Sequence, residues 1–545
     1  MILGDSIFLI IEIICLTALI FVSYVSEKYV SNKWKLAYLA PLFIAILCGA
    51  FFGVDKALTT AYVGSVIIIV GFFVDKKRVR QLVSVVSLLL FILTYQIVDE
   101  SAGYRHADYV EDFNKGFSYI KEHYILSEYK EIDYDALYQK YLPRFEEADK
   151  NHDEVENCIA WNQFCNEFYD GHVYFCPNNE ETMDEATKRK AGNDYGLAVV
   201  KLTNGKYVAV NVDESSAAYR QGIHNGTELV RWDGRSIDDI LDELDYQSFS
   251  TPDKDNESFY APLWVGGAGG EKINVTFIDD SSKEQEITLS KLGDFDIRMK
   301  ETLDIIDDGY KAGNMSFTEI DDETVLFRIK TMMYDMNSAK SEDYTGMQST
   351  VRESLLEYKA KGKKKIIIDL RNNSGGAGLM VKALVELFAE EGEHLYSYDG
   401  VWNDALGNYE VDKETGKYVK GKAVTYMGED IWSHGEIVIL VNGQSASAAD
   451  HLPTLLRGQD NVTVMGFTES CGAAQGVVSQ KLESGTIAFS ASVVLDENGD
   501  IMIDSGTDHE SRNDIDIKIP FDEAAVKALF DAGEDYVLRK AIELK

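Results

Sequence analysis

The chain has 545 residues, of which 53 are basic and 91 acidic, and a formal net charge of −38 at pH 7. This length is too great for one hydrophobic core, so we expect several folding units. An acidic chain repels phosphate backbones, which argues against nucleic acid as a partner. The acidity is more typical of solubility than of a specific basic ligand.

Four apolar runs occupy the first hundred residues, at about 6–25, 36–54, 57–74 and 81–98. Each is close to the roughly 20 residues that cross a bilayer as a helix. A cleaved signal peptide would show only one such run. The pattern therefore predicts a four-helix transmembrane anchor over residues 1–98.

Basic residues concentrate in the first and third loops between these runs. The positive-inside rule assigns both loops to the cytoplasm, which puts residues 99–545 outside it. The sequence thus predicts a multi-pass protein of the plasma membrane, bacterial by its pattern, with an extracytoplasmic catalytic part. A transporter is a weak alternative, because the runs hold few polar residues and show no broken-helix pattern.

From Phe113 to Tyr124, apolar residues recur at i, i+4, i+7 and i+11, as on one face of a helix. Helical patterns continue to about Phe168, and the alternation that follows His172 favours a strand. We therefore expect residues 99–185 to form a small helical region that carries His172 at its end.

Residues 190–292 change to a β-rich pattern, with strands predicted over 207–212 and 228–234. The order of elements resembles a PDZ domain of the protease-associated type. The resemblance implies that a peptide adds to a strand edge while backbone amides capture its terminal carboxylate. The peptide-binding loop would be Tyr195, Gly196, Leu197 and Ala198. A β-rich spacer without a ligand is the alternative.

From about residue 315, strands and helices alternate, which indicates an α/β fold. Two apolar runs, 365–370 and 437–441, are typical of buried strands. The first leads into a turn with two glycines, and the second leads into a helix predicted over 446–457. Residues 295–545 are therefore expected to form an α/β core.

Ser447 stands where the second strand gives way to this helix, within NGQSASAAD. A hydroxyl there feels the positive end of the helix dipole, and the amide of Ala448 can donate to a developing oxyanion. Gly375 and Gly376 follow the first strand and can also turn amides toward a ligand. Ligands bind at the carboxyl ends of strands in such sheets, so both motifs can face one site. The alternative is that Ser447 only caps the helix.

The segments IIIDLRNNSGG and, about seventy residues later, VILVNGQSASAADHL resemble the core of the carboxy-terminal processing peptidases. That family includes the tail-specific proteases and the tricorn core. IDYDALYQKYLPRF and FYDGHVYF are similar to the tricorn-like branch. The resemblance covers about residues 108–520. It implies a multi-domain chain with a PDZ insert, a crotonase-like βαβ peptidase core, endopeptidase activity and no metal or other cofactor.

The branch decides the catalytic base. The processing branch uses a lysine about 25 residues after the serine, where this chain has Gly472 and no lysine before Lys481. The tricorn-like branch uses a histidine from the helical region, which matches His172. Histidine suits this role because its pKa lies near neutral. For the acid that orients the imidazole, the resemblance points to Asp504, with Glu510 in reserve.

None of the six cysteines forms a CxxC pair, so a zinc site has no support. Cys158 and Cys165 lie about 10.5 Å apart along a helix, too far for a bridge. A disulfide with Cys176 or Cys471 stays open. Cys471 is also an alternative nucleophile, although the sequence shows no base beside it.

The sequence therefore predicts a membrane-anchored serine endopeptidase that acts on peptide or protein tails. Ser447 would attack the peptide carbonyl, His172 would take the proton, and amides of Ala448 and Gly375 or Gly376 would hold the oxyanion. The alternative is a catalytically silent, peptide-binding membrane sensor built on the same fold.

Overall fold

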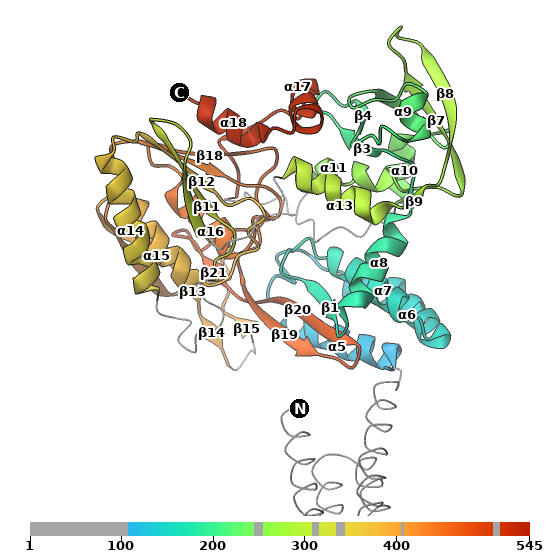
Figure 1. Cartoon of the computed structure of the whole chain (residues 1–545). Helices are drawn as coiled ribbons and strands as arrows, with labels where there is room; N and C mark the ends of the chain where they lie inside the picture. Colours follow the sequence, from blue (N-terminus) through green and yellow to red (C-terminus); the bar gives the residue numbers. More distant parts are fainter. Residues whose placement is uncertain (1–106, 245–253, 308–314, 334–343, 405–407, 505–512) are drawn as a thin grey trace, which may run out of the picture. The chain divides into compact units, whose positions relative to one another are not determined.

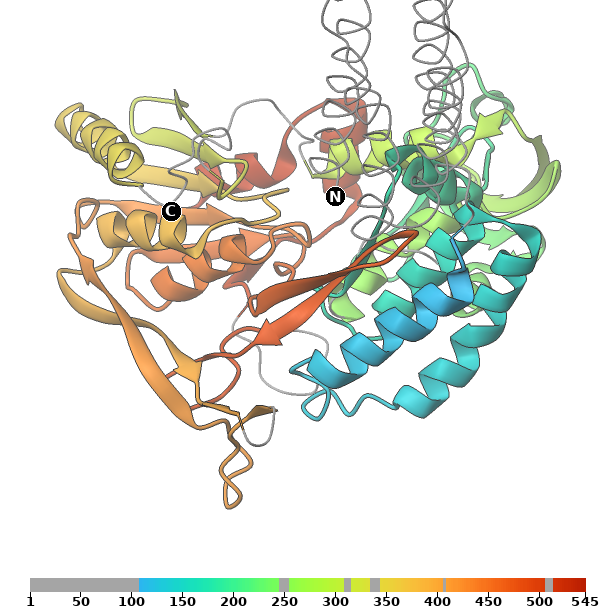
Figure 2. The same cartoon turned by 90° about the horizontal axis from the view of Figure 1, so that it is seen from below.

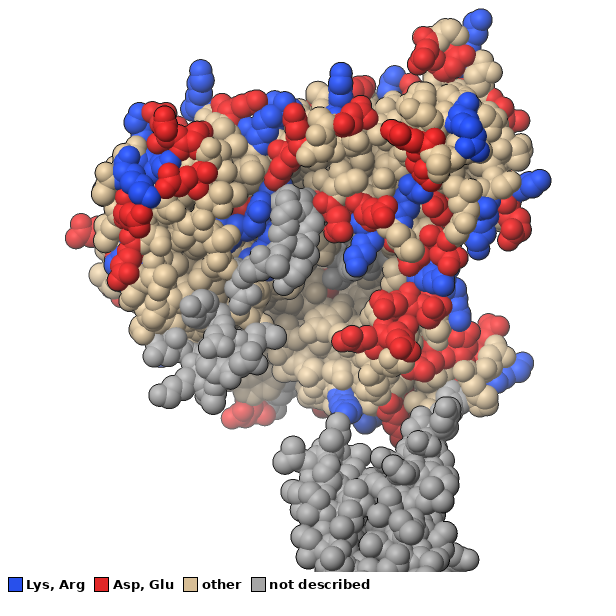
Figure 3. All heavy atoms as spheres, in the orientation of Figure 1, with Lys and Arg blue, Asp and Glu red and all other residues tan. Residues whose placement is uncertain are grey.

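The computed structural model describes residues 107–244, 254–307, 315–333, 344–404, 408–504 and 513–545 (Figure 1). From Asp108 onward the chain forms one compact unit. On the face drawn in Figure 3, basic side chains lie scattered among acidic ones.

The first part of this unit is helical and includes the predicted helix through Phe113. Its elements are α5 (Tyr109–His123), α6 (Tyr134–Asn151), α7 (Glu154–Asn166), β1 (Tyr174–Pro177) and α8 (Glu180–Ala191). α5, α6 and α7 each begin at an aspartate whose carboxylate accepts a hydrogen bond from an amide of the first turn. Aromatic rings fill the space between them: Phe113 stacks on Phe145 at 4.2 Å, and Trp161 packs edge-on against both.

A β-rich segment follows. Its sheet has the order β3-β4-β5-β7-β8, with β6 beside β5. The strands are β3 (Ala198–Lys201), β4 (Tyr207–Val210), β5 (Glu228–Trp232), β6 (Arg235–Ser236), β7 (Lys272–Ile278) and β8 (Glu284–Ser290). The helices are α9 (Ala217–Arg220), α10 (Ile237–Glu243), α11 (Lys254–Tyr260) and α12 (Pro262–Val265). β2 (Asn193–Asp194) and β9 (Gly293–Asp294) pair where the segment begins and ends. The PDZ-like character of this segment and the domain boundaries stay predictions.

The α/β part is built on a six-stranded sheet of order β10-β11-β12-β17-β18-β22. β10 is antiparallel to β11, and all other neighbours are parallel. The strands are β10 (Met315–Glu319), β11 (Thr324–Ile329), β12 (Lys365–Asp369), β17 (Glu436–Leu440), β18 (Val462–Gly466) and β22 (Ile517–Lys518). The two apolar strands expected from the sequence, β12 and β17, are confirmed as adjacent parallel strands.

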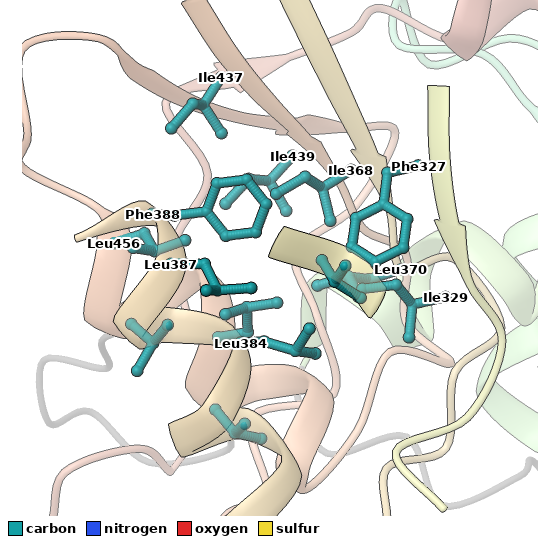
Figure 4. Packing of buried hydrophobic residues seen from close by; sticks show 14 of the residues in the cluster. Phe327, Ile329, Ile368, Leu370, Leu384, Leu387, Phe388, Ile437, Ile439 and Leu456 are labelled. Atoms are coloured by element: carbon teal, nitrogen blue, oxygen red, sulfur yellow. The ribbon is translucent and has the colours of Figure 1, made fainter. Parts of the chain in front are cut away.

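Alternate residues of β12 and β17 serve two apolar layers. Ile368 and Ile439 face a layer closed by α14 (Thr345–Ala360), α15 (Gly378–Phe388) and α16 (Ala448–Leu456), part of which is drawn in Figure 4. Ile367 and Val438 face the opposite layer, which contains α13 (Phe295–Ile306), α18 (Tyr536–Glu543) and residues of β3 and β4. Burial on both faces explains the unbroken apolar runs 366–368 of β12 and 437–440 of β17. α17 (Glu523–Val526) leads through a π-turn at Lys527–Asp531 to α18.

Smaller strands extend from the α/β part. β13 (Gly392–Gly400) lies between β16 (Lys420–Gly428) and β21 (Val494–Leu495), and β14 (Trp402–Asn403) pairs with β15 (Asn408–Tyr409). The hairpin of β19 (Gly476–Lys481) and β20 (Gly485–Ser492) reaches across to the helical part, where β20 pairs with β1 (Figure 2). This pairing ties the segment after His172 to the α/β part.

The predicted fold class is wrong in its membrane component. No helix among the described residues is long and apolar enough to cross a bilayer. The four predicted spans, residues 1–98, lie outside the described residues. The multi-pass localisation at the plasma membrane, and the extracytoplasmic position of the catalytic part, rested on those spans and are withdrawn with them.

Asp112 provides a test of how the hairpin is attached. Its buried carboxylate accepts hydrogen bonds from the amides of Glu483 (2.9 Å) and Ser484 (2.6 Å), at the turn between β19 and β20. Asp112→Ala leaves these amides without an acceptor, and we expect the free energy of opening the hairpin to fall by about 3 kcal/mol. Hydrogen exchange of the β19 and β20 amides should therefore speed up about 100-fold.

Asp108→Ala is the matched control, because Asp108 caps the exposed start of the same helix with one hydrogen bond of 2.8 Å. Loss of this cap should lower the stability of the helix by about 1 kcal/mol and leave hydrogen exchange in the hairpin unchanged. Equal exchange rates in the hairpins of both variants would contradict the role given to Asp112.

Candidate active site

Ser447 adopts a backbone conformation that side chains disfavour. It lies at φ 58° and ψ −119° at the start of α16, and its side chain makes no capping hydrogen bond. Ser447 therefore occupies the N-cap position, but its hydroxyl does not cap the helix. The carbonyl of Asn373 accepts from the amide of Ala446 at 2.9 Å, which helps to hold this conformation. Such strain persists only where surrounding structure enforces it, and it occurs preferentially at functional sites.

The glycine turn after β12 packs directly against Ser447. A Cβ at Gly375 would lie 2.7 Å from the Cβ of Ser447 and 2.6 Å from the carbonyl oxygen of Ala446. Gly375 also has φ 95° and Gly376 has φ 143°, so both conformations favour glycine. Arg371 anchors the start of the turn, because its buried guanidinium bonds Asp369 at 3.0 Å.

The amides of this region are not equally available. The amide of Gly375 donates to Oδ1 of Asn373 at 2.9 Å. The amides of Gly376 and Ala448 donate to no acceptor within the described part of the chain. Of the donors predicted for an oxyanion, Gly376 and Ala448 are thus free to bind a ligand, and Gly375 is engaged.

His172 is buried, with 7% of its surface exposed, in the turn between α7 and β1. Its amide donates to Oδ1 of Asp170 at 2.9 Å, which fixes the turn. Burial lowers the pKa of His172, and the negative charge of Asp170 and a hydrogen bond to the carbonyl of Gln475 oppose this. The imidazole is therefore neutral at neutral pH, and its Nδ1 has no hydrogen-bond partner among the described residues.

Ser447 and His172 line the same cavity, although they are 275 positions apart in the chain. The cavity has a volume of about 620 Å³, and Gly376 and Cys471 also contribute to its wall. The rest of the lining is partly apolar, including Val173, Phe175, Trp264 and Val477. A neutral imidazole, a strained serine and a free amide thus open onto one space. These are the elements that acyl transfer requires.

Helix α16 also positions the loop that contacts His172. Asp450, three residues after Ser447, accepts from the amides of Gly472 at 3.0 Å and Ala473 at 3.3 Å. Burial raises the pKa of Asp450 to about 7, and these hydrogen bonds oppose it. Nε2 of His451 lies 3.3 Å from the carbonyl oxygen of Ala474. Burial lowers the pKa of His451 to about 4. The next carbonyl, of Gln475, is the one that bonds His172.

Asp504 has a different partner from the one expected. Its Oδ1 lies 2.9 Å from Nζ of Lys130, and no described hydrogen bond or ion pair joins it to the ring of His172. Burial raises the pKa of Asp504 to about 7, and the charge of Lys130 opposes this. Glu510, the reserve candidate, lies outside the described residues. The contacts therefore give the predicted orienting role of Asp504 no support.

The sequence analysis did not predict a role for three residues near the site, Asp170, Asp450 and Lys130. Asp170 was visible in principle, because an aspartate two residues before a turn position often accepts that residue's amide. Lys130 contacts residues distant in sequence, so no local pattern reveals it.

The predicted peptide-binding loop is enclosed. Tyr195, Leu197 and Ala198 are almost fully buried, and the amide of Gly196 donates to Oδ1 of Asp194 at 2.8 Å. A Cβ at Gly196 would lie 2.5 Å from the Cβ of Ser216, so the space beside it is filled. Carboxylate capture by residues 195–198 stays a prediction without support from these contacts.

The four cysteines of the described chain are free thiols. The disulfides left open for Cys176 and Cys471 are therefore absent there. Cys471 is buried and lines the cavity with Ser447, and its amide donates to the carbonyl of Ser445 at 2.8 Å.

Comparison with known proteins finds similarity to one peptidase family and to several solved structures. The model of Peptidase family S41 matches residues 326–510. The structure of mature CPAF complexed with lactacystin aligns with a TM-score of 0.51 and 14% identity, over 80% of this chain and 97% of that one. The crystal structure of mature CPAF aligns with a TM-score of 0.51 and 16% identity, over 80% and 96%. At these identities the likeness shows a shared fold. No curated protein matches the sequence.

Gly375→Ala tests the packing of the glycine turn. The new Cβ would collide with Ser447 and Ala446, so Ser447 has to move. We expect the rate at which a fluorophosphonate labels the full-length chain to fall at least about 100-fold.

Gly362→Ala is the control, since Gly362 has φ 82° but nothing within 4 Å of its added Cβ. Gly362→Ala introduces a backbone strain of about 1 kcal/mol without a collision, so the fluorophosphonate should label this variant at the normal rate. Labelling of Gly375→Ala at the rate of Gly362→Ala would show that the contact with Ser447 is unimportant.

Proposed function

We propose that this chain is an endopeptidase in which Ser447 is the nucleophile and His172 is the base. The starting point is that the chain is a serine-type peptidase, with a family S41 core, that acts on protein substrates. The observation that carries this proposal is the strained Ser447 at a cavity that also contains the buried, neutral His172.

In the proposed reaction, Oγ of Ser447 bonds to the carbonyl carbon of the scissile peptide while its proton passes to the imidazole of His172. The C–N bond then breaks, and His172 returns the proton to the leaving amine. Water hydrolyses the resulting ester by the same steps in reverse order. The lowered pKa of His172 supports this role, because a neutral ring is needed to accept the proton.

Two free amides support stabilisation of the tetrahedral oxyanion. Ala448 follows the nucleophile at the N-terminus of α16, and Gly376 lines the cavity from the neighbouring strand end. Neither amide has a hydrogen-bond acceptor within the described chain, so both can donate when charge develops. One such donor contributes about 3–4 kcal/mol to transition-state binding.

The cavity also bears on the substrate. Its apolar walls favour an apolar side chain next to the scissile bond. Capture of a substrate tail at residues 195–198 is not part of the proposal, because these residues are enclosed. We therefore propose cleavage within extended segments of peptides or proteins.

The test uses the full-length chain with a fluorophosphonate and with fluorescein-labelled casein. Ser447→Ala should abolish both labelling and cleavage. His172→Ala should slow both at least about 1000-fold, because the hydroxyl loses its base. Ser349→Ala and His224→Ala serve as matched controls, because both residues are exposed and neither lines the cavity, and they should behave as the unchanged chain does.

Full casein cleavage by Ser447→Ala would contradict the proposal and direct attention to Cys471. Normal labelling of His172→Ala would mean that another group is the base. A folded, unchanged chain that neither labels nor cleaves would favour the catalytically silent, peptide-binding alternative.

A further inference from the structure

The turn that presents His172 is held from three directions. Tyr169, at its start, has φ 45°, a conformation that side chains seldom adopt. Oδ1 of Asp170 accepts from the amide of His172 at 2.9 Å. Oδ2 of the same carboxylate accepts from the hydroxyls of Tyr124 at 3.0 Å and Ser490 at 2.9 Å. Asp170 thus joins the turn to the end of α5 and to β20.

Lys130 adds a bond that Asp170 cannot supply. It lies in the connection between α5 and α6, and its Nζ donates to the carbonyl of Tyr169 at 2.8 Å. The same Nζ lies 2.9 Å from Oδ1 of Asp504. The side chains of Lys130 and Asp504 are 3% and 2% exposed, so the pair is removed from water.

Asp504 connects the pair to helix α16, which begins at Ser447. Asp504 forms a β-bridge with Ala473, whose amide donates to Asp450 of α16 at 3.3 Å. Starting at His172, the chain of contacts therefore runs through Tyr169, Lys130 and Asp504 to the helix that Ser447 begins. Beyond the turn itself, each link joins segments that are distant in sequence.

A contribution to folding stability does not by itself explain why Lys130 and Asp504 form a buried ion pair. Removing two charges from water costs several kcal/mol per ion, and the attraction repays this only when every polar atom is satisfied. Oδ2 of Asp504 has no hydrogen-bond partner among the described residues. Replacing a buried ion pair by apolar residues is often neutral or stabilising, but an apolar side chain could not bind the carbonyl of Tyr169.

We propose that Lys130 is a positioning residue for the catalytic base: by bridging the Tyr169 carbonyl and the Asp504 carboxylate, it sets where His172 stands relative to Ser447. This inference rests on the proposed function of Ser447 and His172. Asp504, predicted to orient the imidazole directly, then acts on it through Lys130.

The test compares Lys130→Met, Asp504→Asn and the double variant Lys130→Met/Asp504→Asn in the full-length chain. Asp504→Asn keeps an oxygen for Lys130 and keeps the bond to Tyr169, so labelling by a fluorophosphonate should stay within about threefold of normal. Lys130→Met should slow labelling about 10- to 100-fold, the effect of a misplaced catalytic group. With casein, kcat should fall while KM stays constant.

The double variant separates positioning from stability. It leaves no buried charge from the pair, so its thermal midpoint should return close to that of the unchanged chain. Its labelling should stay as slow as that of Lys130→Met, because the Tyr169 carbonyl still lacks its donor. Lys140→Met, which loses an exposed pair with Glu167 in the same helical part, is the control and should label normally.

Normal labelling by the double variant would overturn the inference, since a purely structural pair would then be restored by removing both charges. If His172→Ala abolishes labelling while the double variant labels normally, only the role of Lys130 fails. If His172→Ala itself labels normally, the proposed function is contradicted, and the inference that rests on it is contradicted as well.

Discussion

The close contact between Gly375 and Ser447 is the constraint on which the rest of the site depends. The last residues of β12 and β17, Asp369 and Leu440, are register partners in a parallel pair, so the two loops that follow leave the sheet side by side. A Cβ at Gly375 would lie 2.7 Å from that of Ser447, so only glycine fits. This packing accompanies the strained conformation of the serine, and Gly376, the next residue of the turn, lines the cavity. Strand pairing therefore determines the position of both the proposed nucleophile, Ser447, and the proposed oxyanion donor, Gly376.

The proposed base, His172, is positioned by a different set of contacts. His172 belongs to the helical part, which is tied to the α/β part through the pairing of β1 with β20 and the grip of Asp112 on the hairpin turn. Lys130 and Asp170 then fix the turn itself. Because nucleophile and base are carried by separate parts of the fold, catalysis should be more sensitive than overall stability to changes at these contacts. This dependence is why a buried, incompletely satisfied ion pair can be retained near the site.

Local patterns were enough to single out Ser447, the glycine turn and His172, which line one cavity, because each lies at the end of an element with a clear periodicity. They were not enough for contacts that depend on tertiary packing. The engagement of the Gly375 amide by Asn373, and the pairing of Asp504 with Lys130, arise only when distant segments meet. The resemblance to a PDZ domain assigned peptide binding to residues 195–198, but Tyr195, Leu197 and Ala198 are buried in the fold. The anchor was inferred from apolar length alone, and no helix of the described chain has that property.

A crystal structure of the full-length chain after reaction with a fluorophosphonate would test the central claim most directly. The account predicts phosphorus bonded to Oγ of Ser447, with one phosphoryl oxygen about 2.7–3.1 Å from the amides of both Ala448 and Gly376. It also predicts the imidazole of His172 within hydrogen-bond reach of Oγ. A phosphoryl oxygen turned away from both amides, or phosphorus bonded to another residue, would contradict it.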